Sequence, residues 1–559
     1  MTRVDGETLV QLFTRRLAES GDRPALFVPE ERSAAVTWRP VTWSALGNQV
    51  FTLAAALRRL GVRPGDRVVQ VAENRPEWIV ADLAIQFARG VHVPIHATLA
   101  GPQVVEQIRD CGARVVLVST AAQAEKLACD PALCDAIDVW SYEPVCDAIP
   151  DRAVRLLSDL TTGIVGAEAE RVHREAVADV TPDDLATLIY TSGTTGEPKG
   201  VMLSQRNLTT NALATLGMLD FAADDLRVGL LPLSHIYART CDLYCWIACG
   251  YQFALARSRE TALADCVALR PTGINAVPYF YEKVLAAANA MGKPLAETFG
   301  GRVRLCNSGG AALPNHVAEA YRAAGLPLMQ GYGLTETSPV MTLCTPEANK
   351  LGAAGRAIAD VEIRIADDGE IVTRGPNVMQ GYWNRPQATA EVLKDGWFHT
   401  GDLGRIDEDG YLFITGRKKE LIVLASGKNI APVRLEALLT EDPLIEQAMV
   451  VGDGRSYLVA LLAVNRDALA QALVTSHPNG DAKALLADCI ARRLACVSHH
   501  EQVRRFAIVE RPFSIESGEL TPTLKLRRGE IARHYAAEIA ALYAASSEKS
   551  ACASTMGIR

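Results

Sequence analysis

Short apolar runs alternate with helix-like stretches through the first 180 residues of this 559-residue chain. Residues 66–74, 91–96 and 113–120 are such runs, and the helical segment 77–90 stands between the first two. Continuous apolar strands that are joined through helices are typical of parallel sheets covered by helices on both faces. The pattern returns after residue 185. We therefore predict an α/β fold built on parallel sheets.

The sequence changes character after about Pro339. Residues 361–415 contain short strand-like runs and three Asp-Gly dipeptides, which are typical of tight hairpin turns. These dipeptides are Asp368-Gly369, Asp395-Gly396 and Asp409-Gly410. A basic cluster at residues 417–419 interrupts the pattern, and a new α+β stretch follows it. We predict an N-terminal domain of residues 1–415, a smaller C-terminal domain of residues 416–545 and a disordered tail of residues 546–559.

Charge and apolar content exclude several classes of protein. The 57 basic and 65 acidic side chains leave a net charge of −8, which argues against a nucleic-acid partner. The uncharged run 243–256 is shorter than the about 20 residues of a membrane-spanning helix, and we expect a buried helix that continues into a strand. The N-terminus lacks the apolar core of a signal peptide, and the thirteen cysteines form no CxxC pair. These features predict a cytoplasmic protein with reduced thiols.

The sharpest local signal spans residues 188–208. A strand is predicted to end at Tyr190, and a loop of threonine, serine and glycine follows it as far as Lys199. Small residues let the backbone approach a ligand closely, while hydroxyls, amides and one lysine supply donors for phosphate oxygens. Gly193, Gly196 and Lys199 are three residues apart, which differs from the GxxxxGK[ST] spacing of P-loop kinases and GTPases. By composition alone, a flexible surface loop is the alternative interpretation.

A second signal lies between residues 330 and 339. The ring of Tyr332 can stack on a nucleotide base, and the oxygens of Thr335 and Glu336 can hold Mg²⁺ beside phosphate. By itself this pattern also fits a structural turn.

Two further motifs place one charged residue each in a turn. In residues 397–404, Asp402 follows a glycine, and its carboxylate can accept hydrogen bonds from both hydroxyls of a ribose. In residues 519–528, Lys525 stands among threonine and leucine, where a mobile lysine can reach a reacting phosphate. The structural alternatives are an Asx-type turn for the first motif and a basic surface run for the second.

The motifs TSGTTGEPKG, YGLTET, HTGDLG and TPTLK occur here in an order that resembles the adenylate-forming superfamily. That superfamily includes acyl-CoA synthetases, luciferases and the adenylation domains of peptide synthetases. The stretches ENRPEWIVADLAIQ, GRKKELIVLASGKNIAP and FSIESGELTPTLKLRR are most similar to long-chain fatty acyl-CoA synthetases. This resemblance implies a large N-terminal domain of two doubly wound sheets with a β-rich subdomain, followed by a small mobile α+β lid.

The same resemblance implies an activity: a fatty acid and ATP would form an acyl-adenylate with release of pyrophosphate, and CoA would then accept the acyl group. It implies that ATP or AMP is bound by Thr191, Ser192, Gly193, Thr194, Thr195, Gly196, Lys199, Gly309, Gly310, Ala311, Gln330, Gly331, Tyr332, Gly333, Asp402 and Arg417. The catalytic residues it implies are Lys525, Thr335, Glu336 and His235, with Mg²⁺ held by Glu336 and Thr191. Lys419 matches the hinge of the lid, and Ser426, Gly427 and Lys428 match a loop on the CoA side.

Two alternatives stay open at this point. One is an acyl-AMP ligase that loads an acyl-carrier protein, since it shares the first chemical step. The other is a non-catalytic nucleotide-binding homologue, which the presence of every expected polar residue disfavours. Apolar and aromatic stretches within residues 211–310 fit a fatty acid better than acetate or an amino acid. Peripheral membrane contact also stays open, although no polybasic anchor supports it.

Overall fold

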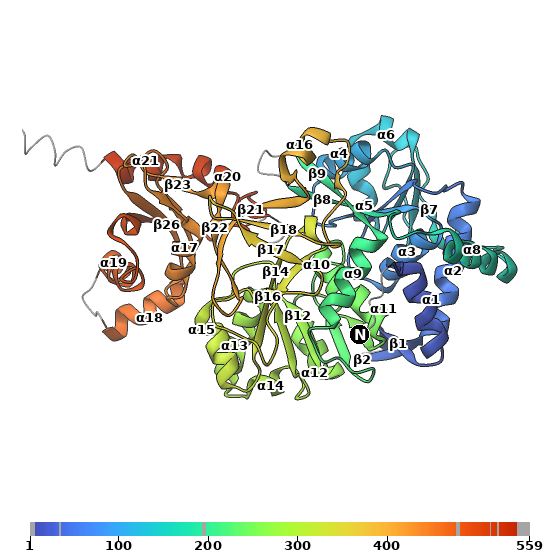
Figure 1. Cartoon of the computed structure of the whole chain (residues 1–559), viewed down its shortest axis with the longest axis horizontal. Coiled ribbons are helices and arrows are strands. Elements are labelled where there is room, and N and C mark those ends of the chain that lie inside the picture. The colour runs from blue at the N-terminus through green and yellow to red at the C-terminus, as the bar shows by residue number, and fades with distance from the viewer. Residues whose placement is uncertain are drawn as a thin grey trace, which may run out of the picture. The chain divides into compact units, whose positions relative to one another are not determined.

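The computed structural model describes residues 6–32, 35–192, 197–476, 481–514, 516–521 and 525–544, and Figure 1 shows their helices and strands. The chain forms two compact units. The first comprises residues 1–364, 372–400 and 406–412, and the second comprises residues 365–371, 401–405 and 413–559. No helix within the described ranges is long and apolar enough to cross a membrane.

The first unit contains an eight-stranded sheet. Its strands are β3 (Arg67–Val71), β4 (Val91–Ile95), β5 (Val115–Val118), β6 (Asp138–Ser141), β7 (Arg155–Leu156), β8 (Leu185–Ser192), β9 (Pro198–Ser204) and β19 (Gly381–Tyr382). They lie in the order β19-β9-β8-β4-β3-β5-β6-β7. All neighbours from β8 to β7 are parallel, whereas β9 and β19 are added antiparallel at one edge. The parallel strands predicted from the apolar runs are therefore confirmed.

A nine-stranded sheet also belongs to the first unit. Its strands are β1 (Pro24–Arg32), β2 (Ala35–Thr42), β10 (Leu226–Gly229), β11 (Gln252–Leu255), β12 (Gly273–Ala276), β13 (Leu305–Ser308), β14 (Leu328–Gly333), β15 (Val340–Leu343) and β16 (Arg356–Ala357). The order is β16-β15-β14-β13-β12-β10-β11-β1-β2. The strands from β14 to β1 are parallel, and antiparallel strands close both edges.

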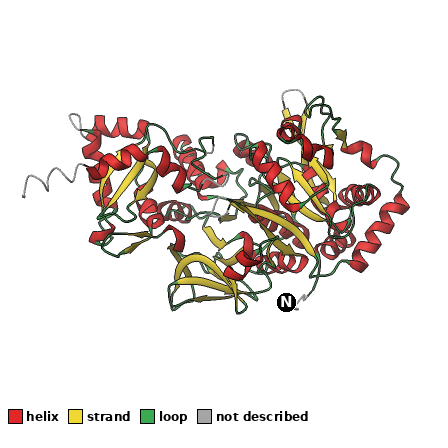
Figure 2. Cartoon of the chain, turned by 90° about the horizontal axis from the view of Figure 1, so that it is seen from above, coloured by secondary structure: helices red, strands yellow, loops and turns green. Residues whose placement is uncertain are grey.

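The first unit also contains helices, which are red beside the yellow strands in Figure 2. They are α1 (Leu9–Ser20), α2 (Trp43–Arg59), α3 (Pro76–Phe87), α4 (Gly101–Cys111), α5 (Ala121–Glu125), α6 (Pro131–Ala136), α7 (Leu157–Thr161), α8 (Gly166–Asp179), α9 (Gln205–Leu216), α10 (Ile236–Ala238), α11 (Cys245–Cys249), α12 (Ala262–Leu269), α13 (Pro278–Met291), α14 (Leu295–Thr298), α15 (Asn315–Ala323) and α16 (Pro386–Val392). Helix α3 starts at a proline, which suits the first turn of a helix, and every residue from Trp78 to Phe87 is buried. A helix that is buried all round belongs to the core.

The predicted buried helix in residues 243–256 is confirmed, with one difference. The segment Arg239–Tyr244 is a π-helix, which leads into α11 and then into β11. Such π-helical turns are rare and occur often at functional sites.

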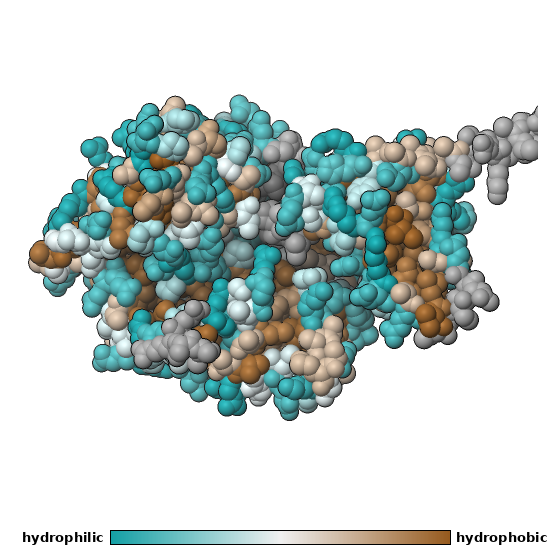
Figure 3. All heavy atoms as spheres, turned by 180° about the vertical axis from the view of Figure 1, so that it is seen from behind, coloured by the Kyte–Doolittle hydropathy of each residue, from teal (hydrophilic) through white to brown (hydrophobic). Residues whose placement is uncertain are grey.

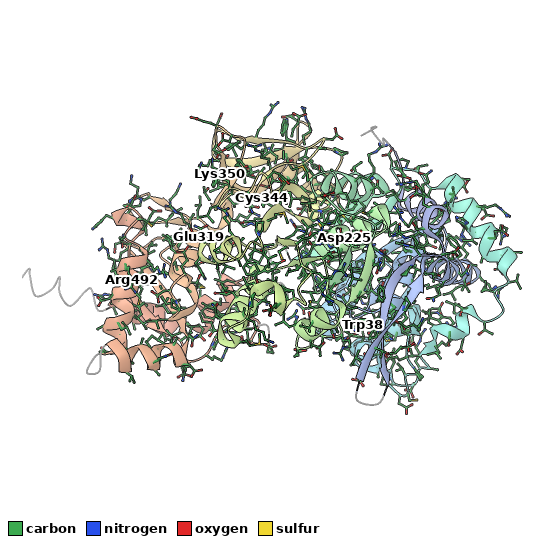
Figure 4. The ribbon with its side chains drawn as sticks, turned by 90° about the horizontal axis from the view of Figure 1, so that it is seen from below. Trp38, Asp225, Glu319, Cys344, Lys350 and Arg492 are labelled. Atoms are coloured by element: carbon green, nitrogen blue, oxygen red, sulfur yellow. The ribbon has the colours of Figure 1, made fainter. Side chains whose placement is uncertain are left out.

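A five-stranded sheet follows, and its residues are divided between the two units. Its strands are β17 (Glu362–Ile365), β18 (Glu370–Arg374), β20 (Leu393–Lys394), β21 (Trp397–Ile406) and β22 (Leu412–Arg417). The hairpin between β20 and β21 turns at Asp395 and Gly396, whose φ angles are 51° and 78°. Two consecutive positive φ angles define the turn that an Asp-Gly pair favours. In the first unit Lys350, labelled in Figure 4, bonds to Asp407 and Asp409 at 2.6 and 3.0 Å.

The second unit has its own α+β core. Its further strands are β23 (Ile422–Val423), β24 (Asn429–Ile430), β25 (Ile445–Val451), β26 (Leu458–Val464) and β27 (Val503–Ile508), and its helices are α17 (Pro432–Thr440), α18 (Arg466–Ser476), α19 (Ala482–Arg493), α20 (Arg528–His534) and α21 (Ala536–Ala544). Strands β25, β26 and β27 form one sheet. The buried strand β26 packs against apolar side chains of α17 and α19 on one face and of α20 on the other. Hydrophilic and hydrophobic residues are interspersed on the surface seen in Figure 3.

A buried carboxylate stands just before the segment that carries Lys525. The side chain of Glu519 is fully buried and accepts hydrogen bonds from Arg511 at 2.8 Å, from Ser517 at 2.6 Å and from His534 at 3.0 Å. Burial alone would raise the pKa of Glu519, but the bonds from Arg511, Ser517 and His534 outweigh it and lower the pKa to about 2. Glu519 is therefore ionised in the folded protein at neutral pH.

Candidate active site

The predicted phosphate loop joins two strands of the first sheet. Strand β8 extends to Ser192 rather than ending at Tyr190, and β9 starts again at Pro198. The two strands form an antiparallel hairpin in which Thr191 is paired with Lys199. The predicted residues Gly193, Thr194, Thr195 and Gly196 lie outside the described residues. The hairpin register therefore sets Thr191 and Lys199 across from each other at the base of the loop.

Tyr382 connects the phosphate hairpin with the YGLTET motif. The ammonium of Lys199 lies 5.2 Å from the centroid of the Tyr382 ring. The hydroxyl of the same tyrosine donates a hydrogen bond of 2.8 Å to Oε1 of Glu336. Sequence reasoning missed Tyr382, because it stands almost two hundred residues after Lys199.

Thr335 and Glu336 form a short 3-10 helix, Thr335–Thr337, directly after β14. The backbone carbonyl of Glu336 accepts a hydrogen bond of 2.8 Å from the amide of Met379. A residue distant in the sequence therefore also holds this short helix in place. Carboxylate and hydroxyl oxygens are hard donors, and Mg²⁺ is commonly bound by one or two of them together with substrate phosphates. No group of three or more metal-ligating His, Cys, Asp or Glu side chains occurs among the described residues.

Two of the segments predicted to bind ATP or AMP lie at neighbouring strands. Ser308, the last residue of β13, is paired with Gln330 in β14. Gly309, Gly310 and Ala311 therefore begin where β13 ends, beside Gln330, Gly331, Tyr332 and Gly333.

Gly333 must be glycine for a steric reason. A Cβ atom at this position would stand 1.6 Å from the carbonyl oxygen of Pro339. Gly309 is also crowded, since its Cβ would meet the ring of Tyr237 at 3.0 Å. Gly333 thus allows two backbone segments to pack closely, and Gly309 leaves room for the ring of Tyr237.

His235 is the N-cap of α10. Its Nδ1 accepts a hydrogen bond of 3.2 Å from the backbone amide of Tyr237. Its ring lies 6.3 Å from that of His96, at an interplanar angle of 27°. Burial lowers the pKa of His96 to about 4, so that this neighbour is uncharged at neutral pH. No sequence motif described above contains His96.

In the second unit, Asp402 and Arg417 form an ion pair. The Nε of Arg417 lies 2.6 Å from Oδ1 of Asp402, which is buried. The pair joins β21 to β22, and it orients the carboxylate predicted to bind a ribose. Nearby, hydrogen bonds to Asp368 and Glu370 raise the pKa of Lys418, the residue just before the predicted hinge Lys419.

The predicted CoA-side loop is a hairpin turn between β23 and β24. The amide of Gly427 donates to the carbonyl of Leu424 at 2.8 Å, and the φ angle of Gly427 is +76°. Ser426, Gly427 and Lys428 are exposed in this turn. The structure therefore places the three residues in one exposed turn of the second unit.

Lys525 also belongs to the second unit and is exposed. Its carbonyl accepts a hydrogen bond of 2.9 Å from the amide of Thr521, and its own amide donates to the Thr521 hydroxyl at 3.0 Å. A bridge between Leu520 and Leu526 closes this turn at its base. Residues 522–524 lie outside the described part of the chain. The predicted site residues are thus distributed between the units: Asp402, Arg417, Lys419, Lys525 and the 426–428 loop belong to the second, and the others to the first.

Parallel sheets, a hydroxyl-rich hairpin at a strand end and an acidic residue beside it define an α/β protein suited to a nucleotide. Comparison with protein families gives matches to nucleotide-binding enzymes. The chain matches the AMP-binding enzyme family over residues 13–383 and the AMP-binding enzyme C-terminal domain over residues 419–547. The chain belongs to the AMP-binding enzyme family.

Individual relatives extend the match along the chain. It is 34% identical to the long-chain-fatty-acid–CoA ligase FadD15 of Mycobacterium bovis over 92% of this chain and 94% of that protein. It is 35% identical to a feruloyl-CoA synthase of an Amycolatopsis species over 74% of this chain and 80% of that protein. The crystal structure of the anthranilate CoA ligase AuaEII in complex with anthranoyl-AMP has the same fold, with a TM-score of 0.80 at 22% identity, covering 96% and 98% of the two chains.

Proposed function

We propose that this chain is an AMP-forming long-chain fatty acid–CoA ligase. The observation that carries the proposal is the 34% identity to a long-chain-fatty-acid–CoA ligase along 92% of the chain. In the first step, a carboxylate oxygen attacks the α-phosphorus of ATP, pyrophosphate leaves, and an acyl-adenylate forms. In the second step, the thiolate of CoA attacks the acyl carbon, AMP leaves, and the thioester forms. Adenylation is needed because a free carboxylate is a poor electrophile.

In this proposal the first unit binds the triphosphate and the base. The hydroxyls and backbone amides of residues 191–196 and the ammonium of Lys199 would hold the β- and γ-phosphates, and Tyr332 would stack on adenine beside residues 309–311. Mg²⁺ would be held by Glu336 and Thr191 and would neutralise charge on the phosphates. The contacts that Tyr382 makes with Lys199 and Glu336 support this assignment, because they tie both groups to one ring.

The second unit would supply the ribose contacts and the catalytic lysine. Asp402, held by Arg417, would accept the ribose hydroxyls. Lys525 would contact the α-phosphate and the acyl carboxylate and stabilise the charge that develops between them. For thioester formation the lid would turn at Lys419, remove Lys525 and bring the turn of Ser426, Gly427 and Lys428 to the reacting centre. His235 would stand at the mouth of the acyl site.

A competition experiment tests the proposal. Purified protein is incubated with Mg·ATP, CoA and an equimolar mixture of short to very long fatty acids and ferulic acid, and mass spectrometry counts every acyl-CoA and acyl-AMP. We expect long-chain acyl-CoA to dominate. Feruloyl-CoA as the main product would instead favour an aromatic substrate, an alternative suggested by a relative of similar identity. Acyl-AMP without thioester would favour transfer to an acyl-carrier protein.

A further inference from the structure

The stretch ENRPEW, residues 73–78, has no role in the proposed chemistry, yet its asparagine forms hydrogen bonds with the distant loop that precedes His235. Asn74 stands between the end of β3 and the start of α3. Its Nδ2 donates a hydrogen bond of 2.7 Å to the carbonyl of Leu231, and its Oδ1 accepts one of 2.8 Å from the amide of Leu233. Both ends of one side-chain amide therefore bind the backbone just before Ser234 and His235.

The next strand holds the same loop through a second contact. His96 follows the end of β4, and its Nδ1 lies 2.7 Å from the hydroxyl oxygen of Ser234, which is buried. Because the His96 ring also faces the His235 ring, the loop is held by its backbone, by Ser234 and by this ring contact.

Helix α3 holds the chain on the other side of His235 as well. Arg239, four residues after this histidine, is fully buried and forms an ion pair with Asp82 of α3. The same guanidinium donates a hydrogen bond of 2.7 Å to the hydroxyl of Thr187 in β8, four residues before Thr191. Asp82 also accepts hydrogen bonds from Tyr244 at 3.1 Å and binds His92 at 2.8 Å. One continuous stretch, residues 74–82, thus binds the chain before and after His235.

Sheet topology explains why these contacts converge. Strands β8, β4 and β3 are neighbours and run parallel, so their carboxyl ends lie at one edge of the sheet. Asn74, His96 and Thr191 stand at or just beyond those ends. In α/β proteins, ligands bind outside the carboxyl ends of the strands. The segment with His235 is therefore docked on the same edge from which the phosphate hairpin extends.

We propose that Asn74 is a positioning residue for the acyl site, which holds the His235 segment in register with the phosphate hairpin. This inference rests on the proposed function. Asn74 itself touches no reacting group; it acts through the backbone of Leu231 and Leu233. Loss of its two hydrogen bonds would release the loop while leaving the core below it intact. A displacement of about 1 Å can lower a reaction rate by about a hundredfold when two reacting groups must be aligned.

Two variants of Asn74 and one control test this role. Asn74→Ala removes both hydrogen bonds. Asn74→Asp keeps the shape and can still accept from the Leu233 amide, but it cannot donate to the Leu231 carbonyl. The control is Asn349→Ala: Asn349 is also half-buried, and its Nδ2 donates a hydrogen bond of 2.9 Å to the carbonyl of Leu328, at the amino end of β14. All three variants lose a bond from an asparagine side chain to the backbone.

Hydrogen exchange and half-reaction kinetics are then measured on the full chain. In both Asn74 variants we expect faster amide exchange confined to peptides covering residues 231–239, and a fall in kcat for pyrophosphate release of about tenfold to a hundredfold. The KM for ATP should stay within about twofold of the wild-type value, because the phosphate hairpin itself keeps its contacts. Asn349→Ala should change neither quantity for this segment or this reaction.

The results distinguish failure of the positioning role from failure of the proposed function. Unchanged exchange at residues 231–239, or faster exchange with an unchanged kcat, overturns the positioning role. Exchange that rises over the whole first unit also overturns it, because Asn74 would then serve only general stability. If the wild-type protein forms no acyl-AMP from any carboxylic acid, the proposed function fails, and the role in the reaction fails with it; the exchange data still decide whether Asn74 holds the segment.

Discussion

Replacing Tyr382 with phenylalanine isolates one hydrogen bond at the proposed magnesium site. The change removes the hydroxyl that donates to Glu336 at 2.8 Å and keeps the ring beneath Lys199. A hydrogen bond to a charged group contributes about 1.5–3 kcal/mol. Because about 1.4 kcal/mol corresponds to a tenfold change in rate, we expect kcat/KM for pyrophosphate release to fall about ten- to a hundredfold if the bond orients Glu336 in the transition state.

The assay follows pyrophosphate release at several Mg²⁺ concentrations. If Glu336 helps to bind the metal, Tyr382→Phe should raise the Mg²⁺ concentration needed for half-maximal rate. Tyr321→Phe is the matched control, since the Tyr321 hydroxyl donates to the carbonyl of Tyr281 at 3.0 Å within a buried core cluster. That variant should lose about 1 kcal/mol of stability and keep its kinetics. Wild-type kinetics and Mg²⁺ dependence in Tyr382→Phe would refute the reasoning.

Three further predictions concern the second unit. Lys525→Ala should abolish acyl-AMP formation from ATP far more than thioester formation from supplied acyl-AMP; near-normal pyrophosphate release would contradict the lysine's role. Lys419→Pro should show the opposite selectivity, and equal loss of both half-reactions would count against a hinge there. Because the pKa of Glu519 is lowered to about 2, its ionised form stabilises the fold above its ordinary pKa of 4.5, and this contribution is lost as pH falls from there towards 2. Melting temperatures measured from pH 7 to pH 3 should therefore fall more steeply for the wild type than for Glu519→Gln, and parallel curves would exclude this linkage.

Local signals in the sequence were sufficient for much of the fold. The apolar runs at β3, β4, β5 and β8 predicted parallel strands correctly, because a strand buried on both faces needs continuous apolar side chains. The Asp395-Gly396 dipeptide likewise predicted a tight turn, since both residues accept a positive φ angle at low cost. Each of these signals depends only on neighbours along the chain.

Other features depended on partners that no local pattern identifies. The phosphate loop was predicted from its composition, but its two sides are strands β8 and β9, and their antiparallel register pairs Thr191 with Lys199. Periodicity also could not assign the parallel strands to two separate sheets, because an apolar run does not specify its neighbour.

The candidate site also combines residues that sequence motifs predict with contacts between distant segments that only the structure shows. Residue types predicted Glu336 and Lys199 as site residues, the family resemblance added His235, and these roles stay predictions. Only the tertiary structure connects Glu336 to Lys199 through Tyr382, and the loop before His235 to Asn74, 157 residues earlier than Leu231. The sequence by itself determined which chemical groups are present and which segments form strands and turns. The tertiary structure decided which groups meet, because hydrogen bonds between distant segments form only where the packed sheets bring their ends to a common edge.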